Sequence, residues 1–284
     1  MSRQYYYLVA GLPDIIFDDK KIPLSTLEYR AYLEEHLEAS EMSLLKTFFW
    51  RFDNKNVLKI LKNTEVEQIG FGNLSLEQLD ELFRCVKDGS NEDAMAIAPG
   101  YLVRFITAYK AETPIIEGKS WELQLSDLYY DYICQTSNTF INNWYTFEKN
   151  ISNVLTALQC RKYEIDRNGK LAGKGEVIEK LEKSSSRDFG LSDEIELIDQ
   201  IIKISEETDL LLQEQKTDLL KWGYLDENSF FHYFSIEKLF VFLIKLSIAE
   251  RWISLDKETG RKLFEELLKD LETSYEFPEE FSLK

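Results

Sequence analysis

The chain is poor in the residue types that most often carry metal-binding or nucleophilic chemistry. It has three cysteines, Cys85, Cys134 and Cys160, and two histidines, His36 and His232. The cysteines form no CxxC pair and no Cys/His cluster lies near either histidine, so neither a disulfide framework nor a zinc site is indicated. We therefore expect buried free thiols in a reducing compartment, and histidines with a structural or surface role.

Proline and long apolar runs are also scarce. Proline occurs at five positions and is absent from residues 115–277, which favours helical structure because proline interrupts helices. The strongest apolar run, Leu239–Ile244, lies between two lysines and is far shorter than the roughly 18–20 residues of a membrane span. The N-terminus is a poor match to a signal peptide, since it has one basic residue and a short apolar stretch ending at Pro13. We expect a soluble, cytoplasmic protein.

The chain has fewer basic than acidic residues. The 284 residues include 34 Lys and Arg against 51 Asp and Glu, a formal net charge of −17. This charge argues against nucleic acid as the main partner and against direct docking on an anionic lipid surface, because both need a basic footprint. It fits a cytosolic protein or one with a basic partner. Residues 176–218 hold 13 acidic and 5 basic residues, which we interpret as a solvated helix face.

The sequence does contain abundant apolar residues with helical spacing. Hydrophobic residues make up 44% of the chain, which excludes general disorder. Capping boxes at Ser25–Glu28 and Ser75–Gln78 predict two helix starts, and Gly89 predicts the end of the second helix. Further helical patterns occupy residues 126–162 and 195–222, a stretch that begins at Ser235, and a last one that begins at Asp256. Only residues 5–10 could be a short extended or buried segment, so the predicted fold class is all-α.

Two breaks in the pattern suggest a domain organisation. Residues 110–121 contain Pro114 and Gly118 and predict a loop, and residues 165–192 contain four glycines and a serine triplet. We predict an N-terminal helical lobe at residues 1–114. Residues 115–284 are predicted to form a second helical region, of one or two lobes, with a mobile connection near 165–192.

Two motifs in this second break come close to ligand-binding signatures. Gly169–Gly175 has three residues, not four, between its first glycine and its Gly-Lys pair, and Gly175 replaces the Ser or Thr of a phosphate-binding loop. The same stretch lacks the Glu that an EF-hand requires at its twelfth position. We interpret it as a glycine turn between helices. The sequence has no GxSxG or HExxH motif, and we predict no catalytic, cofactor-binding or metal-binding residue.

Aromatic residues are concentrated in four clusters, at residues 5–7, 48–50, 129–132 and 230–234. Consecutive residues of a helix point about 100° apart, so a single core face cannot bury a whole cluster. Either helices pack on both sides of the clusters or some of the aromatics line a partner surface. Core packing is the favoured interpretation.

Two segments carry a resemblance to a known family. Residues 5–13 read YYYLVAGLP, and residues 144–162 combine Trp144, Phe147, Glu148 and Asn150 with an Ala-Leu-Gln-Cys-Arg-Lys end. Both are similar to a bacterial branch of the V/A-type ATPase C-subunit family, whose eukaryotic member is the d subunit. The resemblance implies an elongated all-α protein of two to three helical lobes arranged as a funnel. It also implies a non-catalytic rotor subunit, peripheral at the inner face of the membrane, which couples the central shaft to the membrane ring. Trp144, Phe147 and Arg161 are expected to be structural parts of the matched helix, and the interface residues stay unassigned.

Two other functions remain open from the sequence. One is a free-standing acidic helical adaptor that binds a basic protein partner. The other is an enzyme with a carboxylate site, since the acidic residues are too numerous for paired acids to be identified by spacing.

Overall fold

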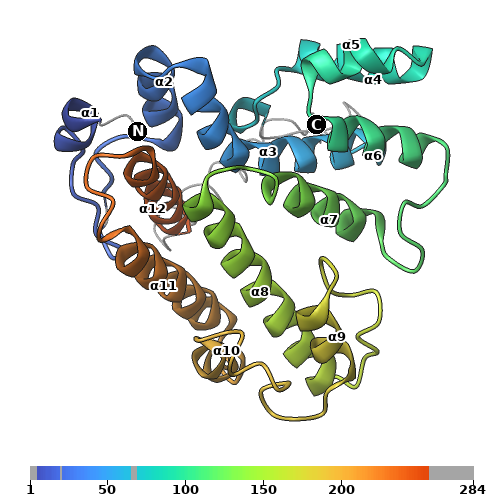
Figure 1. Cartoon of the computed structure of the whole chain (residues 1–284), viewed down its shortest axis with the longest axis vertical. Coiled ribbons are helices and arrows are strands. Elements are labelled where there is room, and N and C mark those ends of the chain that lie inside the picture. The colour runs from blue at the N-terminus through green and yellow to red at the C-terminus, as the bar shows by residue number, and fades with distance from the viewer. Residues whose placement is uncertain (1–4, 20, 65–68, 256–284) are drawn as a thin grey trace, which may run out of the picture.

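The structure is a computed structural model that describes residues 5–19, 21–64 and 69–255 (Figure 1). Within these ranges it consists of twelve α-helices and one 3-10 helix, η1, and has no strand, which confirms the predicted all-α class. No helix in the described ranges is both long enough and apolar enough to cross a bilayer. The helix predicted to start at Asp256 lies outside the described residues.

The elements are, in chain order, α1 (Tyr6–Ala10), α2 (Thr26–His36), α3 (Ala39–Leu61), η1 (Ile69–Phe71), α4 (Leu76–Asp88), α5 (Asn91–Ile97), α6 (Gly100–Lys110), α7 (Trp121–Ile133), α8 (Thr139–Lys162), α9 (Glu176–Lys183), α10 (Ile198–Ser205), α11 (Leu210–Ser229) and α12 (Ile236–Ser254).

The helix termini follow local sequence signals. Ser25 accepts a hydrogen bond from the amide of Glu28, whose side chain accepts from the Ser25 amide, and Ser75 and Gln78 repeat this capping box. Gly89 ends α4 with a left-handed φ of 76°, a conformation that glycine adopts without steric cost. Both predicted helix starts and the predicted stop are therefore confirmed.

The main hydrophobic core is built around α3. Phe48, Phe49 and Trp50 are consecutive in α3 and all buried, because α2, α6, α7 and α12 surround this helix. The core also takes Leu33 from α2 and Phe240 from α12. It thus includes side chains from both sides of the predicted boundary at residue 114, which itself falls in the loop between α6 and α7.

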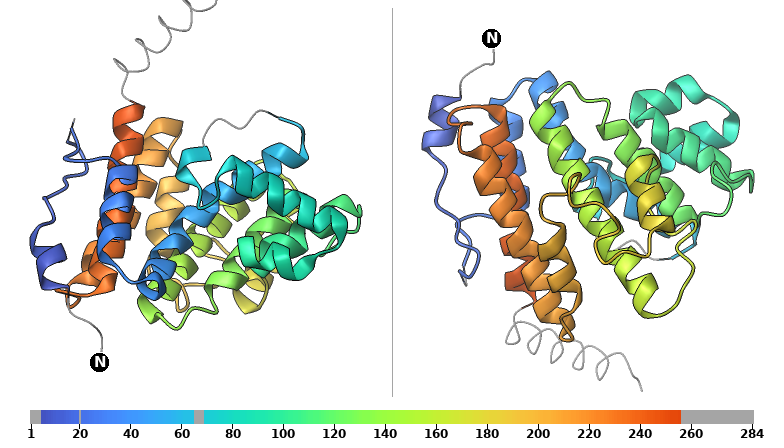
Figure 2. Two further views of the ribbon diagram at one scale, coloured as in Figure 1. Left: turned by 90° about the horizontal axis from the view of Figure 1, so that it is seen from above. Right: turned by 60° about the horizontal axis from the view of Figure 1, so that its bottom comes forward.

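A second, smaller core lies at the far end of α8. Val154 and Ala157 from α8 pack there with Leu181 from α9 and Ile201 from α10. The predicted break at residues 165–192 contains α9 and contributes Phe189, which is 1% exposed, to this core. Figures 1 and 2 show α8 running from the main core to α9, with α1 and α4 to α6 at opposite ends of the molecule.

Three local expectations differ from the structure in whole or in part. Residues 5–10, expected to be a short extended or buried segment, are not extended but form α1 from residue 6, and Tyr5 and Leu8 are buried in the main core. The helical pattern predicted to end at Trp222–Gly223 continues to Ser229, since packing of Leu225 in the main core outweighs the low helix propensity of Gly223. Cys134 is exposed, although Cys85 and Cys160 are buried as predicted.

Candidate interaction surface

Helix α1 turns two tyrosines toward solvent. Tyr5 and Leu8 are buried, whereas Tyr6 and Tyr7, between them in sequence, are 55% and 81% exposed. The position of α1 is set by the backbone, since the Tyr5 amide donates a hydrogen bond to the Phe234 carbonyl at 2.8 Å. The Tyr5 hydroxyl also donates to a carboxylate oxygen of Glu41 on α3. The buried residues thus anchor the helix while its tyrosines project outward.

The connection between α11 and α12 exposes a second group of aromatic side chains. Phe230, Phe231, Tyr233 and Phe234 are all exposed, and Phe231 reaches 82%. The rings of Phe230 and Phe231 pack edge to face, with centroids 5.1 Å apart. Because the connection spans only residues 230–235 between two long helices, it holds these side chains close together at the end of the helix pair.

These two groups form one surface, which we call the aromatic end: Tyr6, Tyr7, Phe230, Phe231, Tyr233 and Phe234. The two groups meet where the Tyr6 ring packs on the Phe234 ring, with a centroid separation of 4.4 Å. Figure 1 shows α1 beside the α11–α12 connection. A groove of about 510 Å³ adjoins the surface, with Tyr7, Pro13, Tyr29 and Phe242 in its wall.

Charged residues of both signs flank the aromatic end in sequence. Residues 5–19 contain three aspartates and residues 226–237 contain Asp226, Glu227 and Glu237, while Lys20 and Lys21 follow the first stretch and Lys238 follows the second. Asp226 forms an ion pair with Lys245, and Glu237 lies 3.5 Å from Nδ1 of His232. Apolar rings therefore lie beside charged groups of both signs at this end of the molecule.

An exposed aromatic patch of this kind is typical of a binding surface. Monomeric proteins rarely expose contiguous apolar patches larger than a few hundred Å², and tyrosine and phenylalanine are enriched where proteins associate. The sequence analysis allowed either core packing or a partner surface for the aromatic clusters, and the structure buries some of these side chains and exposes others. Residues 48–50 are core, whereas Tyr6, Tyr7 and most of the 230–234 cluster are exposed. The contact between residues 5–7 and 230–234 is a tertiary feature that sequence spacing did not indicate.

The two histidines have local structural partners. Nδ1 of His36 lies 2.7 Å from the Tyr32 carbonyl within α2, and its ring packs on the Tyr32 ring. His232 packs against Phe140 at the edge of the aromatic end. Among the described residues no group of three or more His, Cys, Asp or Glu side chains is arranged to hold a metal ion.

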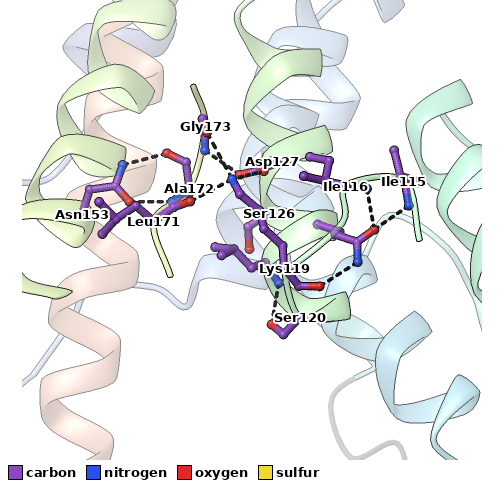
Figure 3. Close-up of polar contacts among 12 residues, drawn as sticks. Ile115, Ile116, Lys119, Ser120, Ser126, Asp127, Asn153, Leu171, Ala172 and Gly173 are labelled. Atoms are coloured by element: carbon purple, nitrogen blue, oxygen red, sulfur yellow. Dashed lines mark hydrogen bonds and ion pairs between the residues drawn. The ribbon is translucent and has the colours of Figure 1, made fainter. Parts of the chain in front are cut away.

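The glycine-rich loop at residues 169–175 is held by side chains of α7, α8 and the loop before α7 (Figure 3). Nζ of Lys119 donates to Oδ2 of Asp127 at 2.6 Å and to the carbonyls of Leu171 and Gly173 at 2.9 and 3.1 Å. Oδ1 of Asp127 accepts from the Gly173 amide at 2.5 Å. We call this arrangement the loop clasp.

Asn153 completes the loop clasp from α8. Its amide group donates to the Ala172 carbonyl and accepts from the Ala172 N–H, both at 2.8 Å. The N–H groups of Ala172 and Gly173, which a phosphate-binding loop would direct at its ligand, are therefore already bonded within the protein. The interpretation of this stretch as a structural turn between helices fits these contacts.

The side chains singled out in α8 also have structural contacts. Trp144 is 1% exposed, and the Phe147 ring stacks on Tyr224 of α11 with centroids 3.8 Å apart. Arg161 donates to the carbonyls of Ser186 and Arg187 at 2.8 and 3.2 Å, and its guanidinium lies 3.9 Å from the centroid of the Phe189 ring. These contacts fit the expectation that Trp144, Phe147 and Arg161 are structural.

Comparison with known proteins identifies the family. The family model described as "Protein of unknown function (DUF2764)" matches residues 1–275, so the chain belongs to this family. No curated protein and no solved structure matches the chain.

Proposed function

We propose that this DUF2764 protein is a non-catalytic docking subunit, and specifically a central-stalk subunit of a V/A-type ATPase that couples the rotating shaft to the membrane ring. The observation that carries the docking role is the aromatic end, where six exposed aromatic side chains from two distant parts of the sequence form one surface. The resemblance to the ATPase C-subunit family supplies the identity of the complex.

The two segments that carry the resemblance have prominent positions in the structure. Residues 5–13 include α1 and contribute Tyr6 and Tyr7 to the aromatic end. Residues 144–162 belong to α8, which has 24 residues and contributes to both hydrophobic cores. A coupling protein needs one end that binds a partner and a stiff element that transmits force to the rest of the molecule. The arrangement of α1 and α8 supports such a role.

In this proposal the protein lies at the cytoplasmic face of the membrane and reaches it only through protein partners. Its helices form two to three lobes arranged as a funnel, and the chain itself carries no catalytic residue. The net charge of −17 supports contact with protein over contact with anionic lipid. It also favours basic contact surfaces on the shaft or the ring loops.

Affinity purification from native membranes tests the proposal. The tagged wild-type chain is expected to co-purify with the ATPase shaft and ring subunits, and a Tyr7→Ser/Phe231→Ser variant is expected to lose them. Both substituted side chains are more than 80% exposed, so the variant should fold normally. Tyr163→Ser removes an exposed ring from the end of α8, away from the aromatic end, and serves as the matched control. Absence of ATPase subunits from the wild-type sample would overturn the assignment.

A free-standing adaptor that binds a basic protein is the second candidate, and the net charge of −17 favours it. It predicts salt-sensitive binding of one soluble basic protein without ATPase subunits, and loss of that binding in the same double variant. The identity of the co-purified proteins thus separates the two candidates.

A further inference from the structure

A second cavity, distinct from the aromatic end, lies between α3, α8, α11 and α12. Its volume is about 630 Å³, within the range of pockets that bind small molecules. Phe48, Phe52, Trp144, Ile244 and Ile248 form the apolar part of its wall. The wall therefore offers aromatic and aliphatic contacts to a ligand.

Four cations converge on the same cavity. Arg51 and Lys55 project from α3, Lys221 from α11 and Arg251 from α12. Such a concentration is unusual in a chain that has 17 more acidic than basic residues. The pKa of Lys55 is lowered by partial burial and by the positive charges of Arg51 and Arg251, which indicates that the three cations lie close together.

The three carboxylates in the wall already have partners. Glu148 accepts from two nitrogens of Arg51 at 3.4 and 3.1 Å, and Glu250 accepts from the amide of Thr26 at 3.1 Å. Asp218 is 2% exposed and accepts from Arg251 and from Nε1 of Trp252, and its second oxygen lies 3.7 Å from Nζ of Lys221. The three carboxylates are therefore occupied by other groups of the protein, and none of them accepts a hydrogen bond from Lys55.

In the part of the chain that the structure describes, one cation of the wall lacks an acceptor. Lys55 has no oxygen acceptor among the described residues, and its ammonium group lies 5.9 Å from the centroid of the Phe52 ring. Lys55 is an exposed residue, so its ammonium group is open to an anionic ligand that enters the cavity.

We propose that this cavity binds a small organic anion, in which a carboxylate or phosphate group faces Lys55, Lys221 and Arg51 and an apolar or aromatic body packs against Phe52 and Trp144. Charge-assisted hydrogen bonds to the anionic group supply specificity, and burial of the body supplies most of the affinity. This inference does not depend on the proposed coupling role.

Calorimetric titration of the full-length protein with three matched probes tests the proposal. Benzoate and phenyl phosphate carry the two anionic groups on an aromatic ring, and benzyl alcohol is a neutral analogue of similar size. Saturable binding of either anion is expected, with benzyl alcohol at least about tenfold weaker, because a hydrogen bond to a charged group is stronger than one to a neutral group. The tighter of the two anions identifies the preferred group.

Substitutions locate the binding in the cavity. Lys55→Met is expected to weaken the tighter anion about tenfold, and Lys55→Arg to retain most of the affinity. Lys87→Met removes the same charge from an exposed position of α4 and should leave the affinity unchanged. Lys221→Met provides a second test from α11. The proposal is overturned if neither anion binds saturably, if benzyl alcohol binds as tightly as the anions, or if both cavity variants bind like the wild type.

Discussion

The Lys119 ammonium group lies 2.6 Å from an oxygen of Asp127, and the two side chains are only 11% and 5% exposed. Lys119 precedes α7 in the loop predicted at residues 110–121, and its other acceptors, Leu171 and Gly173, lie in the break predicted at residues 165–192. The two predicted breaks in the helical pattern, residues 110–121 and 165–192, are therefore in contact with each other. Gln124 adds to this junction from α7, because its side chain bonds the backbone of Ile115, Ile116 and Lys119.

Replacement of Lys119 by Met should destabilise the protein by about 3 kcal/mol. The substitution leaves the Asp127 carboxylate and two loop carbonyls without their donor, and breaking a buried ion pair on one side costs about 3–5 kcal/mol. Urea unfolding measures the effect. Lys183→Met removes the exposed Lys183–Glu179 pair and should change stability by less than about 0.5 kcal/mol. Similar small effects for both variants would contradict the role assigned to the loop clasp.

Gly169→Ala should be more damaging than Gly190→Ala, although both glycines have a positive φ, 66° and 70°. The backbone conformation costs both variants about 1 kcal/mol. At Gly169 the new Cβ would also lie 2.5 Å from the Gly118 carbonyl oxygen, whereas at Gly190 it meets no atom within 4 Å. An additional loss of about 1–3 kcal/mol is expected for Gly169→Ala. Equal unfolding midpoints for the two variants would show that the segments at 118 and 169 are not in close contact.

Asp53 should make stability depend on pH. Burial raises the pKa of Asp53 to about 6, even though its carboxylate accepts hydrogen bonds from the amides of Asn73 and Leu74 at 2.7 and 3.0 Å. Because this pKa exceeds the unfolded value of 3.8, the folded state holds the Asp53 proton more tightly than the unfolded state does. The stabilisation that this proton provides is fully present below about pH 4 and is lost as the pH rises through 6.

Comparison of the wild type with Asp53→Asn isolates this contribution. Asparagine does not titrate, so the wild-type free energy of unfolding minus that of the variant should fall by about 3 kcal/mol between pH 3.5 and pH 7. A difference that stays constant with pH would contradict the raised pKa.

One cysteine of the three should react rapidly with a thiol reagent in the native protein. Cys134 is exposed after α7, whereas Cys85 and Cys160 are buried, and burial and the neighbouring Glu81 raise the pKa of the Cys85 thiol. Spectrophotometric titration should therefore count one fast thiol under native conditions and three in denaturant. Cys134→Ser should abolish the fast phase. Rapid reaction of two or three thiols in the native state would show that the packing around α4 or α8 differs from this structure.

Local signals in the sequence determined much of the helical structure. The capping boxes at Ser25 and Ser75 and the left-handed Gly89 were predictable because they depend on residues within one turn of each other. Helix continuation through Gly223 was not predictable, since it depends on Leu225 packing into the main core. The same limit applies to α1, whose single turn exists because Leu8 and Tyr5 are buried by distant segments.

By itself, the sequence established an acidic all-α protein without a recognised catalytic motif, because charge, composition and helical periodicity are properties of neighbouring residues. Only the tertiary structure decided which aromatic clusters are core and which are surface. Residues 48–50 and 230–234 look alike in sequence, but α3 is surrounded by other helices, whereas the 230–234 connection lies at the end of the α11–α12 pair. The contacts of the glycine-rich loop and the lining of the cationic cavity were also decided only by the tertiary structure. The residues that form them lie far apart along the chain. They come together because α3, α7, α8 and α12 pack against other parts of the fold, which a sequence pattern does not show.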